Sequence, residues 1–207
     1  MQGTTILYYV CIILIKFTEN ILRIVPDMVK NNVIIITGNK GEGKTTKLQR
    51  IVKLIKKEKI SMTGFLAYAD LKDGDRNGYT LVDIVSSKSI ILCSNEPCST
   101  YEKIGRFYFN PLAIKFGQKL LNTNPVEKTL IVIDEVGPFE LQNKIWYDSL
   151  VYQLGIPKNV ILLIVRTKLV DEIIRKFEIT NTNIYKLSVD DIDIVNEIKT
   201  HFQIQKI

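Results

Sequence analysis

The sequence has few of the residues that build disulfide frameworks and metal clusters. Its 207 residues include three cysteines, Cys11, Cys93 and Cys98, and one histidine, His201. Four residues separate Cys93 from Cys98, no second pair lies nearby, and His201 has no cysteine or histidine close to it. This pattern indicates neither a zinc site nor a disulfide framework. Free thiols are typical of a reducing compartment, so we predict a cytoplasmic protein.

The sequence also lacks an apolar run long enough to cross a membrane. The run Ile6–Ile15 has ten residues, whereas a spanning helix needs about twenty. No lysine or arginine precedes the run and no small-residue cleavage site follows it, which argues against a signal peptide. We therefore predict that residues 1–31 form an apolar extension, an added strand or helix that packs on the domain or on a second copy. A peripheral membrane contact is the alternative.

The charge balance is moderately basic, with 28 Lys and Arg against 22 Asp and Glu and a formal net charge of +6. Such an excess fits polyphosphate ligands and tolerates nucleic acid, but by itself it mainly sets solubility and encounter rates. The length suits one domain with a single core. We predict that this domain covers residues 32–207, and the sequence does not indicate an oligomeric state.

Apolar strand-like runs alternate with helical patterns along this domain. Val33–Gly38 and Leu130–Asp134 are short and rich in β-branched residues, and Val160–Val165 lacks alternation, which is typical of strands buried on both faces. A helical apolar pattern begins at about Lys44. The alternation predicts an α/β fold with a mostly parallel sheet flanked by helices.

A different pattern interrupts this alternation between residues 62 and 93. Two strand-like runs flank the turn-forming stretch KDGDRNG, which predicts an antiparallel hairpin inserted beside the main sheet. Asn110 and Pro111 then have the residue types of a helix cap and a first helical position. Leu112, Ala113, Phe116 and Leu120 are expected on the apolar side of this helix.

The first chemical motif is GNKGEGKT, Gly38–Thr45, which matches G-x-x-x-x-G-K-[ST] between a strand and an amphipathic helix. Glycines let the backbone curl so that its N–H groups point at phosphate oxygens, and the helix N-terminus adds its positive dipole end. Lys44 is predicted to reach the β and γ phosphates and Thr45 to ligate magnesium. The predicted nucleotide-binding residues are Gly38, Asn39, Lys40, Gly41, Glu42, Gly43, Lys44, Thr45 and Thr46.

The second motif is LIVIDEVGPFEL, Leu130–Leu141, in which an acidic pair follows a buried-type strand. Asp134 is placed to hold Mg²⁺ directly or through water. Glu135 is one residue further, where a carboxylate can polarise a water in line with the γ phosphate. Hydrolases position that water, whereas kinases exclude it.

Together these motifs resemble the nucleoside-triphosphatase family known from thermophilic microbes, which is also similar to the cancer-related nucleoside triphosphatase of animals. DEVGPFEL resembles that family's DEIGPMEL pattern, and the stretches Gly64–Tyr79 and Ile104–Gly117 resemble two of its further segments. The resemblance covers most of residues 33–201. It implies a RecA-like P-loop fold and hydrolysis of ATP, GTP and other triphosphates to diphosphates with Mg²⁺.

Arg76 and Arg106 fall in segments expected to overhang the nucleotide, where a guanidinium near the γ phosphate accelerates hydrolysis. The alternative for both arginines is surface charge that shapes a loop. Of the two, Arg106 is predicted to be catalytic, together with Lys44 and Glu135. Arg166-Thr167-Lys168 follows the Val160–Val165 run, either as part of the ligand edge or as a helix-opening loop. RTKLVD lacks the N-K-x-D box of guanine-selective proteins, so weak base selectivity is expected.

Three functions remain open from the sequence. The leading one is a nucleoside-triphosphate phosphohydrolase. A kinase that passes the γ phosphoryl group to a nucleotide, a nucleic acid or a small molecule is the second. The third is a slow nucleotide-dependent switch that binds RNA or protein.

Overall fold

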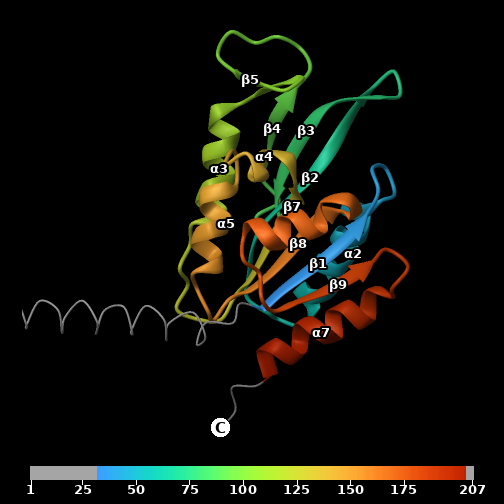
Figure 1. Cartoon of the computed structure of the whole chain (residues 1–207), viewed down its shortest axis with the longest axis vertical. Helices are drawn as coiled ribbons and strands as arrows, with labels where there is room; N and C mark the ends of the chain where they lie inside the picture. The colour runs from blue at the N-terminus through green and yellow to red at the C-terminus, as the bar shows by residue number, and fades with distance from the viewer. Residues whose placement is uncertain (1–31, 204–207) are drawn as a thin grey trace, which may run out of the picture. The chain divides into compact units, whose positions relative to one another are not determined.

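A sheet of nine strands organises residues 32–203, the part of the chain that the computed structural model describes (Figure 1). Its strand order is β5-β6-β4-β3-β2-β7-β8-β1-β9. The predictions about residues 1–31 lie outside the described residues. Within residues 32–203, no helix is both long and apolar enough to cross a membrane.

The sheet has two halves that share strand β2. The parallel half consists of β2 (Met62–Lys72), β7 (Leu130–Val136), β8 (Val160–Arg166), β1 (Asn32–Gly38) and β9 (Thr182–Lys186). The antiparallel half adds β3 (Asp75–Asp83), β4 (Ser89–Ser94), β6 (Phe107–Phe109) and β5 (Glu102–Ile104). The predicted mostly parallel sheet with flanking helices is confirmed.

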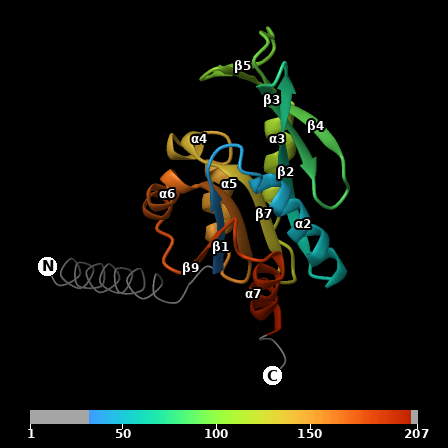
Figure 2. The same ribbon diagram turned by 90° about the vertical axis from the view of Figure 1, so that its right-hand side faces the viewer.

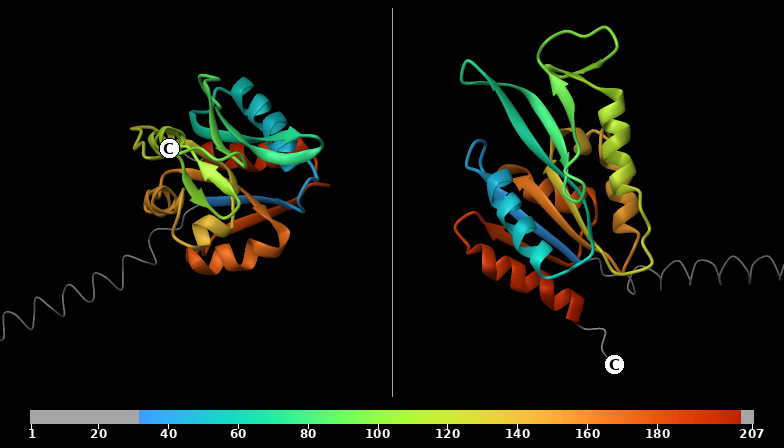
Figure 3. Two further views of the ribbon diagram at one scale, coloured as in Figure 1. Left: turned by 90° about the horizontal axis from the view of Figure 1, so that it is seen from above. Right: turned by 180° about the vertical axis from the view of Figure 1, so that it is seen from behind.

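Helices cover both faces of the parallel half, as the two rotated views show (Figures 2 and 3). One face carries α2 (Lys44–Lys57) and α7 (Asp191–Gln203). The other carries α5 (Tyr147–Leu154) and α6 (Val170–Lys176), with α3 (Pro111–Leu121) under the antiparallel half. The short helices α4 (Pro138–Leu141) and η1 (Thr167–Leu169) follow β7 and β8 at the carboxyl edge of the sheet.

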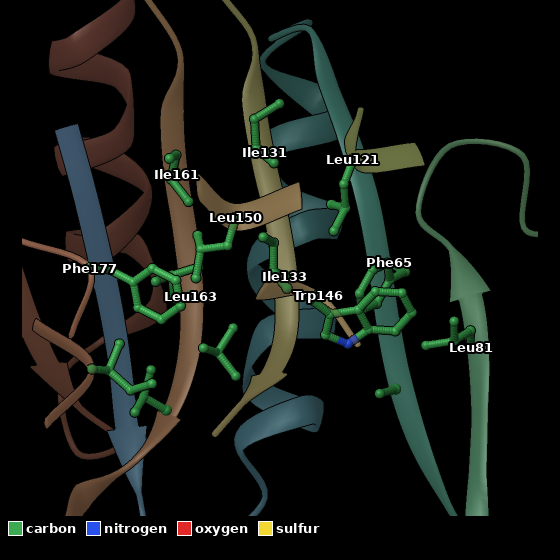
Figure 4. Packing of buried hydrophobic residues seen from close by; sticks show 14 of the residues in the cluster. Phe65, Leu81, Leu121, Ile131, Ile133, Trp146, Leu150, Ile161, Leu163 and Phe177 are labelled. Carbon is green, nitrogen blue, oxygen red and sulfur yellow. The ribbon is translucent and has the colours of Figure 1, made fainter. Parts of the chain in front are cut away.

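Alternate residues of the central strands divide the core into two layers. Ile131 and Ile133 of β7 face the layer of α5 and α6, together with Ile161 and Leu163 of β8 (Figure 4). The residues between them, such as Val132, face α2 and α7. This two-sided burial explains why these strands read as continuous apolar runs.

Strand β2 joins the two halves of the sheet. Its first residues, 62–65, pair in parallel with β7, and residues 65–72 pair antiparallel with β3. The predicted hairpin is therefore present, but it is continuous with the main sheet rather than beside it. Gly64 permits this junction, because its φ is +121° and a Cβ there would lie 1.9 Å from the Val132 carbonyl oxygen.

Helix α3 begins as the sequence predicts. The Asn110 side chain accepts a hydrogen bond from the Leu112 N–H, and Pro111 opens the helix. The predicted apolar face is partly wrong, because Leu112 is 67% exposed and the buried residues are Ala113, Gly117 and Leu121. These three are four residues apart and so share one side of the helix. Gly117 leaves room for the Trp146 ring, which a Cβ would approach to 2.5 Å.

Candidate functional site

The loop that follows β1 curls through two left-handed glycines. Gly41 has φ +83° and Gly43 has φ +88°, and a Cβ at either would meet no atom within 4 Å. The glycines are therefore needed for backbone conformation rather than for space. Gly38 is different, since a Cβ there would lie 2.5 Å from Leu187 Cδ1.

Helix α2 begins directly after this loop with its N-terminus open to a ligand. Gly43 is the N-cap, and within residues 32–203 neither a side-chain cap nor an acidic residue in the first turn satisfies the first N–H groups. These groups and the helix dipole favour an anion at this position. The predicted ligand Thr45 is half-buried and Thr46 is exposed, and both lie in the first turn.

The loop's own side chains make contacts that the sequence did not reveal. Glu42 accepts hydrogen bonds from the Asn39 N–H at 2.6 Å and from Asn39 Nδ2 at 2.8 Å, and the Asn39 side chain lowers the pKa of Glu42. The Lys44 ammonium donates to the Asn39 carbonyl at 2.5 Å. Lys40 is exposed at the tip of the loop. The nine predicted phosphate-loop residues thus run from the end of β1 through the loop into the first turn of α2.

Lys44 is buried, with an exposure of 6%. Burial lowers its pKa, while the Glu135 and Asp134 carboxylates act in the opposite direction. Both acids of the second motif therefore lie within electrostatic reach of the loop lysine. A desolvated ammonium near two carboxylates is suited to bind phosphate oxygens.

The position of α2 is fixed from its other side by a buried lysine. Lys47 donates to Asp191 Oδ1 and to the Val189 carbonyl, each at 2.6 Å. Its side chain is 3% exposed. Because Asp191 begins α7, this ion pair connects the start of the phosphate-binding helix to the last helix of the described chain.

Asp134 lies completely buried near the end of β7. Its Oδ2 accepts a hydrogen bond from the Ala67 N–H at 3.0 Å, and within residues 32–203 its Oδ1 has no hydrogen-bond partner. Burial raises its pKa to about 7, and interactions with Ala67 and the Thr45 side chain oppose that rise. A buried carboxylate oxygen without a partner beside a threonine hydroxyl fits a Mg²⁺ ion or its bound water.

Glu135 stands on a β-bulge. The register of β7 against β8 shifts between Ile133 and Val136, so three steps along β7 match two along β8. Glu135 is the extra residue and has φ +63°, in the left-handed region that non-glycine residues rarely occupy. Bulges of this kind re-aim side chains next to active sites. Backbone strain at an acidic residue beside the phosphate loop supports a functional role.

A cross-strand ion pair ties Glu135 to the phosphate loop. Arg166 Nη2 lies 3.2 Å from Glu135 Oε2, with side-chain exposures of 28% and 25%. In the pairing of β1 with β8, Arg166 stands opposite Gly38, the first residue of the loop. The sequence left Arg166 open between a ligand edge and a helix-opening loop. Both descriptions fit the structure, because Arg166 lines the cavity next to Glu135 and is also the N-cap of η1.

A cavity of about 250 Å³ adjoins the acidic pair. Both arginines that the sequence singled out line it, and so do Lys40, Asp134, Glu135 and Arg166. Arg106 is exposed, lies 4.6 Å from the centre of the Phe107 ring and donates to the Arg76 carbonyl at 3.2 Å. The structure thus brings the predicted basic and acidic residues together around one space.

The remaining wall of the cavity is aromatic, and it was not predicted from the sequence. Its rings are Tyr79, Phe107, Phe109, Phe139 and Trp146, and the apolar residues Ala67, Leu92, Pro138 and Ile145 lie among them. These rings come from β3, β6 and the residues after β7, so no local periodicity groups them. The F-x-F spacing of Phe107 and Phe109 was the one available signal, because alternate residues of a strand share a face.

Glu140 also lines the cavity and was not predicted from the sequence either. Its carboxylate accepts hydrogen bonds from the Gly137 N–H at 2.7 Å and from the Trp146 N–H at 3.4 Å. Burial raises its pKa to about 7. By binding two backbone groups, Glu140 holds the segment after Glu135 against the start of α5.

A glycine-rich loop between a strand and a helix, with a buried aspartate at the end of a nearby strand, defines a P-loop nucleotide-binding domain. Strand β8 lies between the loop strand β1 and the aspartate strand β7. Comparison with known proteins agrees. Residues 33–199 match the family model described as NTPase, and the chain belongs to this family.

Relatives and solved structures of this family resemble the chain at moderate identity. The nucleoside-triphosphatase THEP1 of Thermotoga sp. (strain RQ2) is 31% identical over 112 residues, which are 54% of this chain and 61% of that protein. The protein of the same name from Archaeoglobus fulgidus is 28% identical over 148 residues, 70% of this chain and 86% of that protein. The solution structure of a human cancer-related nucleoside triphosphatase superposes with a TM-score of 0.63 at 20% identity, covering 85% of this chain and all of that one. The match thus spans about three-fifths of the Thermotoga protein, and the human structure supports the fold alone.

Proposed function

We propose that this protein hydrolyses nucleoside triphosphates to nucleoside diphosphates and phosphate with Mg²⁺. The observation that carries the proposal is the Glu135–Arg166 pair. In this pair the strained carboxylate, next to the buried Asp134, contacts Arg166, which stands opposite the first residue of the phosphate loop. The family membership and the names of the curated relatives support the same activity.

In this proposal the phosphate loop and α2 bind the triphosphate. The N–H groups after Gly41 and the open helix N-terminus hold the phosphate oxygens. Lys44 exchanges its contact with the Asn39 carbonyl for the β and γ oxygens. Arg106 is the catalytic arginine, and its position on the cavity wall supports a contact with charge that develops on the γ phosphate.

The two carboxylates have different roles, metal binding and proton transfer. Asp134 and Thr45 would hold Mg²⁺, which neutralises charge on the phosphates when it is bound. Glu135 accepts the proton of the attacking water, the water's oxygen bonds to the γ phosphorus, and the bond to the β–γ bridging oxygen breaks. The proton leaves Glu135 after the diphosphate and phosphate separate.

Base selectivity and cellular location are proposed from the sequence and the cysteines. Weak base selectivity is proposed because RTKLVD, Arg166–Asp171, lacks an N-K-x-D box. The substrates are then ATP, GTP and other triphosphates. A cytoplasmic location is supported by the free thiols of Cys93 and Cys98.

A phosphate-release assay over ATP, GTP, CTP, UTP and their deoxy forms tests the proposal. Release should depend on Mg²⁺ and vary only severalfold among bases, and the product should be the diphosphate. Absence of release from all eight nucleotides at saturating Mg²⁺ would refute hydrolysis. A strong preference for one base would refute weak selectivity while leaving hydrolysis intact.

A further inference from the structure

The cavity beside Glu135 is larger than an attacking water needs. An attacking water occupies about 30 Å³ in the liquid, and an apolar cavity of about 150 Å³ can bind benzene. At about 250 Å³, the space next to Asp134 and Glu135 has room for one aromatic ring with a small substituent.

The lining of the cavity suits an aromatic ring. Phe107, Phe109, Phe139 and Trp146 contribute four rings to one wall. The ring of Phe109 is perpendicular to its neighbours, with centroids 6.5 Å from Phe107 and 5.2 Å from Phe139. Phe107, Phe109 and Trp146 are also buried core residues, so a ring in the cavity would add to an existing aromatic cluster.

The same cavity has two arginines without an ion-pair partner in the described chain, although the carboxylates Asp134, Glu135 and Glu140 also line it. Arg166 is paired with Glu135, but within residues 32–203 neither Arg76 nor Arg106 forms a salt bridge. Arg76 donates from Nη1 to the Tyr79 hydroxyl at 2.7 Å and lies 5.2 Å from the centre of its ring. Its Nε is buried and has no hydrogen-bond partner in the described chain. A buried donor on a cation without an acceptor favours an anionic ligand group.

The cavity lies on one defined side of the acidic pair. Most of its wall comes from β2, β3, β4, β6 and the segment after β7, whereas the phosphate loop contributes Lys40 alone. A ligand there would sit next to Glu135, mainly beside the antiparallel half of the sheet, with Lys40 and Arg166 on its remaining side.

We propose that this cavity, which adjoins the place of the γ phosphate, is a second binding site for a small organic anion that carries one aromatic ring. The ring packs against Phe107, Phe109, Phe139 and Trp146, and Arg76 binds the anionic group. The bound ligand occupies the space from which water reaches Glu135, so it slows hydrolysis. This last consequence rests on the proposed function, whereas the binding itself does not.

Trp146 provides a direct test, because it is the only tryptophan of the sequence and it lines the cavity. The probe is 4-nitrophenylphosphonate, whose nitroaromatic ring quenches indole emission on contact and whose C–P bond resists hydrolysis. Methylphosphonate is the control without a ring. We expect saturable quenching by the probe and none by methylphosphonate.

The titration is repeated in Lys44→Ala and in wild type with Mg²⁺ and a non-hydrolysable triphosphate. Quenching should persist in both, because the phosphate loop contributes Lys40 alone to the cavity wall. Loss of quenching in Lys44→Ala, or displacement of the probe by the triphosphate, would overturn the proposal by assigning the probe to the nucleotide site. Neither titration depends on catalysis. A negative phosphate-release assay would therefore refute the proposed function without refuting the second binding site.

Two basic residues, one that lines the cavity and one that lies near it, are substituted to identify the residue that binds the anionic group of the probe. Arg76→Ala should weaken probe binding about 10- to 100-fold, the loss of one charge-assisted hydrogen bond. Lys103→Ala is the matched control, because Lys103 lies over Tyr108 on the neighbouring strand and does not line the cavity. Arg76→Gln keeps the side-chain length and replaces Arg76→Ala if that variant does not fold. Unchanged binding in a folded Arg76 variant would overturn the proposal.

Discussion

In the parallel half of the sheet, the central strands β1, β7 and β8 are buried on both faces, and the charged groups stand where these strands end. In the antiparallel half, most residues of β3 and β4 are half-buried or exposed, and functional groups line a cavity along the strands. The first arrangement fixes a few groups for phosphate chemistry. The second arrangement lines a cavity, so its residues determine which ligand can bind next to the phosphate site. Substitutions in the two halves should therefore affect different properties of the protein.

The largest effect is expected at Lys44, in the parallel half. Lys44→Ala removes the buried ammonium next to both carboxylates, so nucleotide affinity and turnover should both be abolished. Titration with a non-hydrolysable triphosphate and phosphate release measure the two losses. Lys53→Ala, at an exposed position of α2, is the matched control. Wild-type affinity in Lys44→Ala would refute the loop assignment.

Glu135→Gln should separate binding from chemistry. The amide keeps the size of the side chain but does not accept the proton of water, so the rate should fall by roughly 10² to 10⁴ while triphosphate and Mg²⁺ still bind. Asp134→Asn should also raise the Mg²⁺ requirement, because it weakens a predicted metal ligand. Phosphate release over a range of Mg²⁺ concentrations distinguishes the two variants. Hydrolysis at the wild-type rate in Glu135→Gln would favour the kinase or switch functions instead.

A substitution in β2, where the two halves of the sheet meet, should lower the free energy of unfolding rather than change the chemistry. Gly64→Ala places a Cβ against the Val132 carbonyl at a positive φ, so it should destabilise the fold by more than about 4 kcal/mol or prevent folding. Gly74→Ala is the control, because Gly74 has φ +83° in the β2–β3 turn with no atom within 4 Å. It should cost only about 1 to 2 kcal/mol. Urea unfolding measures both, and equal costs would show that collision at Gly64 is unimportant.

The smallest effect is a pH dependence of stability from Glu140. Burial raises its pKa to about 7 in the folded protein, from the ordinary glutamate value of 4.5. The folded protein therefore keeps this proton between about pH 4.5 and 7 while the unfolded chain loses it. Stability from this group is highest below pH 4.5 and falls as pH rises, by about 3 kcal/mol at most.

Glu140→Gln does not titrate, so its stability should fall less steeply than that of the wild type between about pH 5 and 7. Denaturant midpoints at half-unit pH steps measure this difference. Glu178→Gln controls for the loss of one carboxylate at an exposed site. Parallel wild-type and Glu140→Gln profiles would contradict the raised pKa.

The sequence was most informative where function depends on consecutive residues. Gly38–Thr46 and the pair Asp134-Glu135 were predicted with their neighbouring strand and helix, because a phosphate loop requires a fixed local order. The cavity could not be predicted in this way, since Tyr79, Phe109 and Trp146 meet only after β3, β6 and the start of α5 pack together. Leu112 was misassigned because its helix has a narrow buried side formed by Ala113 and Gly117.

The left-handed backbone at Glu135 implies that selection for activity and selection for folding oppose each other at this position. A non-glycine residue in such a conformation costs about 1 to 3 kcal/mol, which glycine does not incur. Glu135→Gly should therefore melt at a higher temperature than the wild type although it lacks the carboxylate. A library of variants enriched only for thermal resistance would accumulate glycine here and lose turnover, whereas enrichment for phosphate release would restore glutamate.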